Sequence, residues 1–177
     1  MAGGERIRLF CALRLPGDVL DAVVAWQLAH LRGGRIVPRE NLHVTLAFLG
    51  SRPESDLPRV VDALRAAAGD AGLPLLAVHG YRETRSVGML TLDDRDGRAS
   101  ALAERLFDGL EAAGVYRRET RPWFPHLTVL RFRDRPRLRP PLPGIDPFAA
   151  SDAAAYLSRL HPHGARYEVL ESVPLSF

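Results

Sequence analysis

Two short stretches of the sequence each place a histidine and a threonine two residues apart. The stretch "ENLHVTLAFLG" contains His43 and Thr45, and the stretch "WFPHLTVLRFR" contains His126 and Thr128. Both are otherwise apolar and rich in β-forming residues, so each predicts a strand on which the histidine and the threonine share one face. Two polar groups on one face of a core strand are costly unless they are hydrogen bonded. They are expected where a strand lines a reaction cleft.

Phosphodiester cleavage suits a site with two imidazoles and two hydroxyls. One group must deprotonate the attacking water and another must protonate the departing oxygen. Imidazole, with a reference pKa of about 6.5, can do either near neutral pH without a metal. The hydroxyls of Thr45 and Thr128 can donate hydrogen bonds to the non-bridging phosphate oxygens. The residues alone do not decide which histidine is the acid, because the motif is nearly symmetric.

Chance does not explain the two motifs. With six His and five Thr in 177 residues, about 0.17 His-x-Thr pairs are expected, and two are present. A single pair would be interpreted as a core histidine bonded to its neighbouring threonine or to a backbone carbonyl. Two pairs at equivalent places in similar segments favour a function.

The elements that must position these residues follow from the spacing of apolar residues and from Gly and Pro. Helices are expected over 17–34, 54–72 and 97–114, and strands over 6–16, 40–50, 73–83, 87–94, 123–133, 154–160 and 166–175. The Pro- and Arg-rich segment 134–147 is typical of a linker before the final hairpin, which turns at "HPHG". The pattern predicts an α+β fold with mainly antiparallel sheets and helices on the outer faces.

The opening pattern of strand, helix and motif strand occurs twice. Ile7 in the first strand lies 36 positions before His43, and Gly88 in the corresponding later strand lies 38 positions before His126. This similar spacing predicts an internal duplication, with repeats at roughly 6–50 and 87–132 inside a single domain of residues 1–177. If the repeats pack about a pseudo-twofold axis, the two His-x-Thr pairs face each other across a cleft.

Composition limits the classes of function only loosely. All 24 basic residues are Arg, and the net charge is +3. Arg suits phosphate partners, but a bias in genomic base composition also explains the absence of Lys, so the positions of the Arg residues must carry any argument about nucleic acid. The single cysteine, Cys11, excludes a Cys-based metal cluster built from this chain alone. Without a signal-peptide pattern or an apolar run of roughly 18 residues, a soluble, cytoplasmic protein is expected.

Along nearly its whole length the chain resembles the RNA 2',3'-cyclic phosphodiesterases, the LigT-like 2'-5' RNA ligase family of the two-histidine phosphoesterase superfamily. The resemblance lies in "RLFCALRLP", "ENLHVTLAFLG", "RPWFPHLTVLRFR" and "YLSRLHPHGARYEVLESVPL". It implies a bilobal fold with a central cleft, no metal and no cofactor. It also implies that His43 is the proton donor and His126 the proton acceptor. The expected reaction opens a terminal 2',3'-cyclic phosphate on RNA to a 2'-phosphate, with 2'-5' ligation as its reverse, and a monomer is expected.

Phe48 and Arg131 each follow a motif histidine by five positions, where the family places an aromatic residue and an arginine near the substrate. In a regular strand an odd offset points a side chain to the face opposite the histidine. A bulge, a strong twist or a strand end must therefore redirect both residues if they contact substrate. Core packing is the alternative for Phe48. A phosphate contact is favoured for Arg131, because a buried unpaired Arg is costly.

Other candidates allow two interpretations each. His161 and His163 at the hairpin turn have a spacing that could ligate a metal, but without a recognisable third ligand an exposed turn is expected. Trp123 and Phe124, directly before the second motif, could line the cleft rim and stack bases. A run of arginines could follow an RNA backbone or lie in a solvated loop; it comprises Arg131, Arg133, Arg135, Arg137 and Arg139.

Two further functions fit the same residues. The site could act on small cyclic nucleotides or on 2'-5' oligonucleotides, and only the loops at the cleft rim would separate these substrates. The chain could also be a non-catalytic module that binds RNA ends. The presence of both complete motifs argues against this last possibility.

Overall fold

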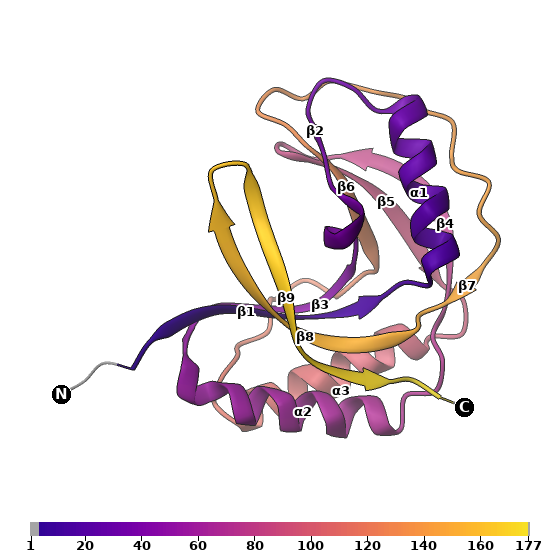
Figure 1. Cartoon of the computed structure of the whole chain (residues 1–177). Coiled ribbons are helices and arrows are strands. Elements are labelled where there is room, and N and C mark those ends of the chain that lie inside the picture. Colours follow the sequence, from indigo (N-terminus) through magenta and orange to yellow (C-terminus); the bar gives the residue numbers. More distant parts are fainter. Residues whose placement is uncertain (1–3, 177) are drawn as a thin grey trace.

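The structure is a computed structural model that describes residues 4–176, and within that range it contains nine strands in two antiparallel sheets and three α-helices (Figure 1). The first sheet has the order β3-β1-β8-β9 and consists of β3 (Val44–Pro53), β1 (Arg6–Arg14), β8 (Asp152–His161) and β9 (Gly164–Pro174). The second has the order β2-β6-β5-β4-β7 and consists of β2 (Arg35–Ile36), β6 (His126–Arg131), β5 (Val87–Asp94), β4 (Leu75–Glu83) and β7 (Phe148–Ala149). The predicted α+β fold with antiparallel sheets is confirmed.

Each of the two motif strands is connected to its partner strand through a helix that covers the other sheet. The helices are α1 (Gly17–His30), α2 (Leu57–Gly69) and α3 (Arg98–Ala112), with short 3-10 turns η1 (Arg39–Asn41) and η2 (Glu54–Asp56). Helix α1 connects strands of the first sheet but packs on the second, where buried Gln27 donates hydrogen bonds from Nε2 to the carbonyls of Val37 (3.0 Å) and Val129 (2.9 Å). Helix α3 connects strands of the second sheet but packs against α2 and β3 (Figure 1). This exchange joins both sheets through one continuous core.

A second, smaller apolar cluster lies on the opposite face of the first sheet. Phe10 and Ala12 alternate along β1 with core residues, and they pack with Ala154 and Tyr156 of β8 and with Tyr167 of β9. Because side chains alternate between the faces of a strand, this cluster lies on the side away from the main core. Its aromatic rings pack beside His43 of the first His-x-Thr motif.

The expected bounds of several elements need correction. The first helix ends at His30 and not at the two glycines after it, because Leu31 is extended (φ −102°, ψ 138°) and turns its buried side chain into the core. His43 lies one residue before β3 and not inside it. Strands β2 and β7 were not expected, since two residues carry no measurable periodicity.

The Pro- and Arg-rich segment is held in place by one buried carboxylate. Glu83 at the end of β4 accepts hydrogen bonds from the backbone N–H groups of Arg137 (2.8 Å) and Leu138 (3.0 Å), and Arg135 pairs with the same carboxylate. Arg135 therefore helps to fasten this segment to β4. The expected role of the arginine run in following an RNA backbone stays a prediction.

Candidate active site

The imidazole of His43 is oriented by two hydrogen bonds. Its Nδ1 lies 2.7 Å from the carbonyl oxygen of Asn41, the last residue of η1. Because a carbonyl can only accept, Nδ1 carries the proton of this bond, and the neutral ring keeps its lone pair on Nε2. Nε2 lies 2.9 Å from Oγ1 of Thr45. The first motif therefore presents Nε2 and the threonine hydroxyl at one point.

Aromatic side chains surround the His43 ring. The ring centroid of Phe10 is 4.9 Å away, and Tyr167 meets the ring edge-on at 5.4 Å. Burial lowers the pKa of His43 to about 4, the hydrogen bond to Asn41 opposes this change, and the positive charges of Arg131 and His126 lower the pKa further. In the free protein His43 is therefore neutral at pH 7.

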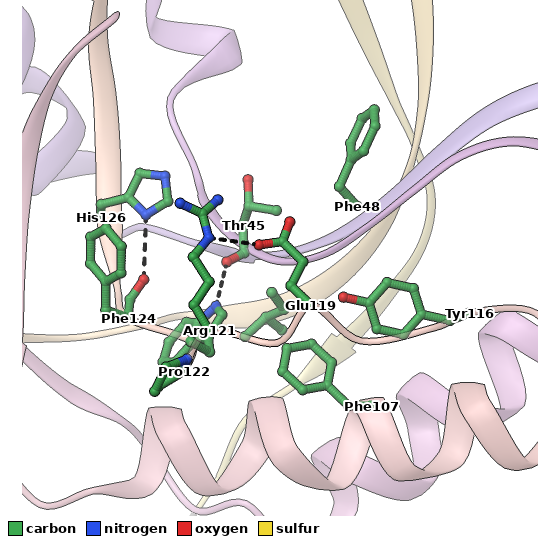
Figure 2. Close-up of a pocket in the computed structure, with 11 residues that line it drawn as sticks. Thr45, Phe48, Phe107, Tyr116, Glu119, Arg121, Pro122, Phe124 and His126 are labelled. Atoms are coloured by element: carbon green, nitrogen blue, oxygen red, sulfur yellow. Dashed lines mark hydrogen bonds and ion pairs between the residues drawn. The ribbon is translucent and has the colours of Figure 1, made fainter. Parts of the chain in front are cut away.

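His126 is the first residue of β6 and has the same local arrangement. Its Nδ1 lies 3.3 Å from the carbonyl oxygen of Phe124, again the residue two positions earlier, and the Phe124 ring is 5.0 Å away (Figure 2). Burial lowers the pKa of His126, and the nearby positive charges of Arg82 and Arg121 lower it further, against the raising effect of the bond to Phe124. Both motifs therefore fix the Nδ1–H tautomer and place the lone pair of each ring on Nε2, which in His43 is hydrogen bonded to Thr45.

A β-bulge in each motif strand turns Phe48 and Arg131 to the same face as the motif residues. In β3, Thr45 pairs with Ala12 and Ala47 pairs with Cys11, so Leu46 has no partner in β1. The extra residue reverses the alternation, and Phe48 joins Thr45 on the wall of one cavity. Phe48 is 55% exposed, so core packing is not its role.

Strand β6 has a β-bulge at the same distance from its histidine. In β6, Thr128 pairs with Met89 and Leu130 pairs with Gly88, so Val129 has no partner in β5. Arg131 is thereby redirected, and it lines a cavity together with Thr128 and His43. The two segments that follow the histidines have the same order of burial. In each, the third and fourth residues after the histidine are buried and the fifth is exposed.

Two cavities between the sheets are each lined by residues from both motifs. One has a volume of about 150 Å³ and is lined by His126 of the second motif and Thr45 of the first, together with Phe48. The other has a volume of about 70 Å³ and is lined by His43 of the first motif and Thr128 of the second, together with Arg131. Each histidine thus shares a cavity with the threonine of the opposite motif, as expected for a cleft between two equivalent strands.

The sequence of this chain matches a known protein family. The family model of the 2'-5' RNA ligase superfamily matches residues 16–162, a range that holds both His-x-Thr motifs. The chain belongs to this superfamily. A relative from Thermus thermophilus named RNA 2',3'-cyclic phosphodiesterase is 32% identical, with 96% of this chain and 90% of that protein covered. One of the same name from Escherichia coli (strain K12) is 29% identical, with 94% and 96% covered.

Solved structures of the superfamily have the same fold. The crystal structure of E. coli LigT complexed with 3'-AMP covers 98% of this chain and 100% of its own, with a TM-score of 0.84 at 24% identity. A crystal structure of a Thermus thermophilus protein covers 96% and 98%, with a TM-score of 0.82 at 32% identity. The resemblance to the LigT-like family and the fold it implies are confirmed.

Glu119 and Arg121 line the cleft but carried no clear signal in the sequence. The larger motif cavity is also lined by the Arg121–Glu119 pair (3.0 Å), and Figure 2 shows the Arg121 guanidinium between His126 and Glu119. Trp123, expected at the rim, lines this cavity and donates a hydrogen bond from Nε1 to the carbonyl of Thr45 (3.0 Å), which ties the loop before β6 to β3. Phe124 lines it as well.

The hairpin histidines are exposed, as expected, but the turn leans toward the cleft. Asn41 donates a hydrogen bond from Nδ2 to the carbonyl of Ala165 (2.9 Å) and so fastens the hairpin to η1. As a result His163 borders the cavity that contains His43. Across residues 4–176, no three His, Cys, Asp or Glu side chains come together as a metal-ligand set, and no helix there is long and apolar enough to cross a membrane.

Proposed function

We propose that this chain is an RNA 2',3'-cyclic phosphodiesterase, which hydrolyses a terminal 2',3'-cyclic phosphate to a 2'-phosphomonoester by metal-independent acid–base catalysis. The observation that carries the proposal is that His43 shares a cavity with Thr128 and that His126 shares one with Thr45. Relatives that bear this name and are 29% and 32% identical over nearly the whole chain support it. The proposal includes a monomer, since one chain supplies both motifs. It also includes a cytoplasmic location and weak 2'-5' ligation as the reverse reaction.

In the proposed mechanism, Nε2 of His126 accepts a proton from water as the water oxygen forms its bond to phosphorus. The bond from phosphorus to the 3' oxygen breaks, and His43 donates the proton that converts this oxygen to a hydroxyl. Thr45 and Thr128 donate hydrogen bonds to the non-bridging oxygens, and their preorganised hydroxyls stabilise the charge that develops there. Arg131 binds the phosphate with its planar fork, and Phe48 contacts the nucleoside.

The lowered pKa values fit a site that is completed by its substrate. In the free protein burial holds both imidazoles in the neutral form at pH 7. A bound phosphate anion adds a negative charge beside His43 and Arg131, which favours the protonated imidazole and raises its pKa. The proton donor is therefore formed when the cyclic phosphate binds.

A direct assay tests this function. A short RNA with a terminal 2',3'-cyclic phosphate is incubated with the protein in the presence of a chelator, and the product is identified as the 2'- or 3'-phosphate. We expect hydrolysis to the 2'-phosphate at a rate that the chelator does not change. Absence of hydrolysis, or activity that a divalent metal restores, would contradict the proposal.

A further inference from the structure

A third cavity, rich in arginine, adjoins the two that hold the motif residues. It has a volume of about 450 Å³ and lies between the β8–β9 hairpin and the side chains of Arg8, Arg35 and Arg131. Arg35, Arg131 and Tyr167 also line the cavity that contains His43. The proposed catalytic cleft therefore continues into this cavity along the hairpin.

The charge of this cavity is not balanced by the protein. Its lining contains no Asp or Glu. In the described part of the chain none of Arg8, Arg35 and Arg131 belongs to an ion pair. The Nε atom of Arg8 is buried and lacks a hydrogen-bond partner within the same range, a rare state for a buried donor. An anion in this cavity would balance the charge of the three guanidinium groups.

An exposed aromatic ring accompanies the arginines. Phe48, which is 55% exposed, lies under the Arg8 guanidinium with 5.6 Å between the guanidinium carbon and the ring centroid. Tyr167 supplies a second ring to the same lining. Cationic groups that follow a backbone and aromatic rings on which bases stack are the usual features of sites for single-stranded nucleic acid.

We propose that this cavity binds the phosphodiester that precedes the terminal nucleotide of a single-stranded RNA, with Arg8 and Arg35 holding that phosphate. The inference rests on the proposed function and adds to it a binding site for the phosphate one nucleotide before the reacting end. Arg131, which lines both cavities, is then placed between the terminal and the preceding phosphate. The strand leaves along the hairpin and not through the cavity with Glu119, where the charge of Arg121 is already balanced by that carboxylate.

The test compares three substrates with the same terminal nucleoside. They are a mononucleoside 2',3'-cyclic phosphate, a trinucleotide that ends in this group, and the same trinucleotide with an uncharged methylphosphonate at its last linkage. For the wild-type protein we expect kcat/KM to be about 10- to 100-fold higher for the charged trinucleotide than for the neutral one, the range for a charge-assisted hydrogen bond. Arg8→Ala and Arg35→Ala should each remove most of this preference. Arg8 lies outside the cavity that contains His43, so Arg8→Ala should affect the mononucleotide far less.

Matched variants separate this role from a general loss of charge or of folding. Arg95 is exposed, lies outside the cavity and belongs to no ion pair among the described residues, so Arg95→Ala should keep the full preference. Arg8→Lys keeps the charge but not the planar fork and should keep only part of the preference. The decrease in trinucleotide binding with salt should be shallower by about 0.7 in the log–log slope for each lost phosphate contact.

The outcomes distinguish the subsite from the activity. Hydrolysis of all three substrates with equal kcat/KM, or a preference that survives both Arg8→Ala and Arg35→Ala, overturns the subsite alone. If no substrate is hydrolysed, the proposed function fails. Fluorescence anisotropy of labelled charged and neutral trinucleotides that end in a 2'-phosphate then decides on the subsite by the same comparison.

Discussion

The two His-x-Thr motifs share their spacing, their tautomer and their bulge, yet their histidines lie in different surroundings. His43 is packed against Phe10 and Tyr167, and its Nε2 is bonded to the threonine of its own motif. His126 lies beside Phe124 at the rim of the cleft, and its hydrogen bond to the backbone is exposed. A repeated sequence thus produces one geometry in two environments.

This difference teaches that the motif alone does not assign the acid and base roles. Burial lowers the pKa of both histidines, and for His43 it reaches about 4 with the help of the positive charges of Arg131 and His126. A group with so low a pKa acts as a proton donor only when a bound anion restores its proton. The roles therefore depend on what each ring faces in the complex, and the following experiments test this asymmetry in order of expected effect.

The largest effect is expected from removing either imidazole. His43→Ala and His126→Ala should each reduce kcat about 10²- to 10⁴-fold, the contribution of a positioned general acid or base. Both variants should keep a cooperative melting transition in circular dichroism, which shows that the loss is chemical. Turnover near the wild-type rate in either variant would break the equivalence of the two motifs.

The threonines should follow, with a difference between them. Thr45→Ala and Thr128→Ala should lower kcat by roughly 10- to 1,000-fold, as does the removal of a hydrogen-bond donor to a transition state. Thr45 also holds Nε2 of His43, so its replacement should cost more than that of Thr128. Single-turnover kinetics measure both, with Thr→Ser variants as milder controls. If only the melting temperature changes, the threonines are structural.

Arg131 should have a smaller effect, seen mainly in substrate binding. Arg131→Ala should raise KM about 10- to 100-fold, and Arg131→Lys should recover only part of this loss, because a lysine keeps the charge but not the fork. Removal of its charge should also raise the pKa of His43. Steady-state kinetics and NMR titration of the histidine ring check the two effects. Unchanged KM in Arg131→Ala would show that the bulge at Val129 does not deliver Arg131 to the substrate.

The smallest effect is a displacement of the pH optimum. The base His126 must be neutral, so activity is lost as the pH falls, and the acid His43 must be protonated, so activity is lost as the pH rises. Because both pKa values lie below 6.5 in the free protein, the bell-shaped profile of kcat/KM should have its maximum on the acid side of pH 6.5. The profile of kcat should lie at higher pH, since bound phosphate raises the pKa of His43.

The variants assign the limbs of this profile. Residual activity of His126→Ala should lack the acidic limb, and that of His43→Ala should lack the alkaline limb. The opposite assignment would reverse the roles of donor and acceptor without affecting the two-histidine chemistry. A rate that rises steadily to high pH would instead indicate hydroxide or metal-bound water as the nucleophile.

The sequence by itself determined the elements and the chemical groups of this protein. Apolar periodicity and the Gly and Pro positions predicted both motif strands, all three helices and the α+β class, because these signals act over a few neighbouring residues. The unusual polar pairs also identified His43, Thr45, His126 and Thr128 as candidates. Their catalytic roles and the internal duplication stay predictions.

Only the tertiary structure decided which groups meet. The bulges at Leu46 and Val129 arise from register between paired strands, so no local pattern could show that Phe48 and Arg131 face the cleft. The exchange of helices between the sheets, the lowered pKa of His43 and the cavity that Arg8 shares with Arg131 depend on contacts between distant segments. Packing, burial and electrostatic interaction act through space, whereas a sequence records only order along the chain.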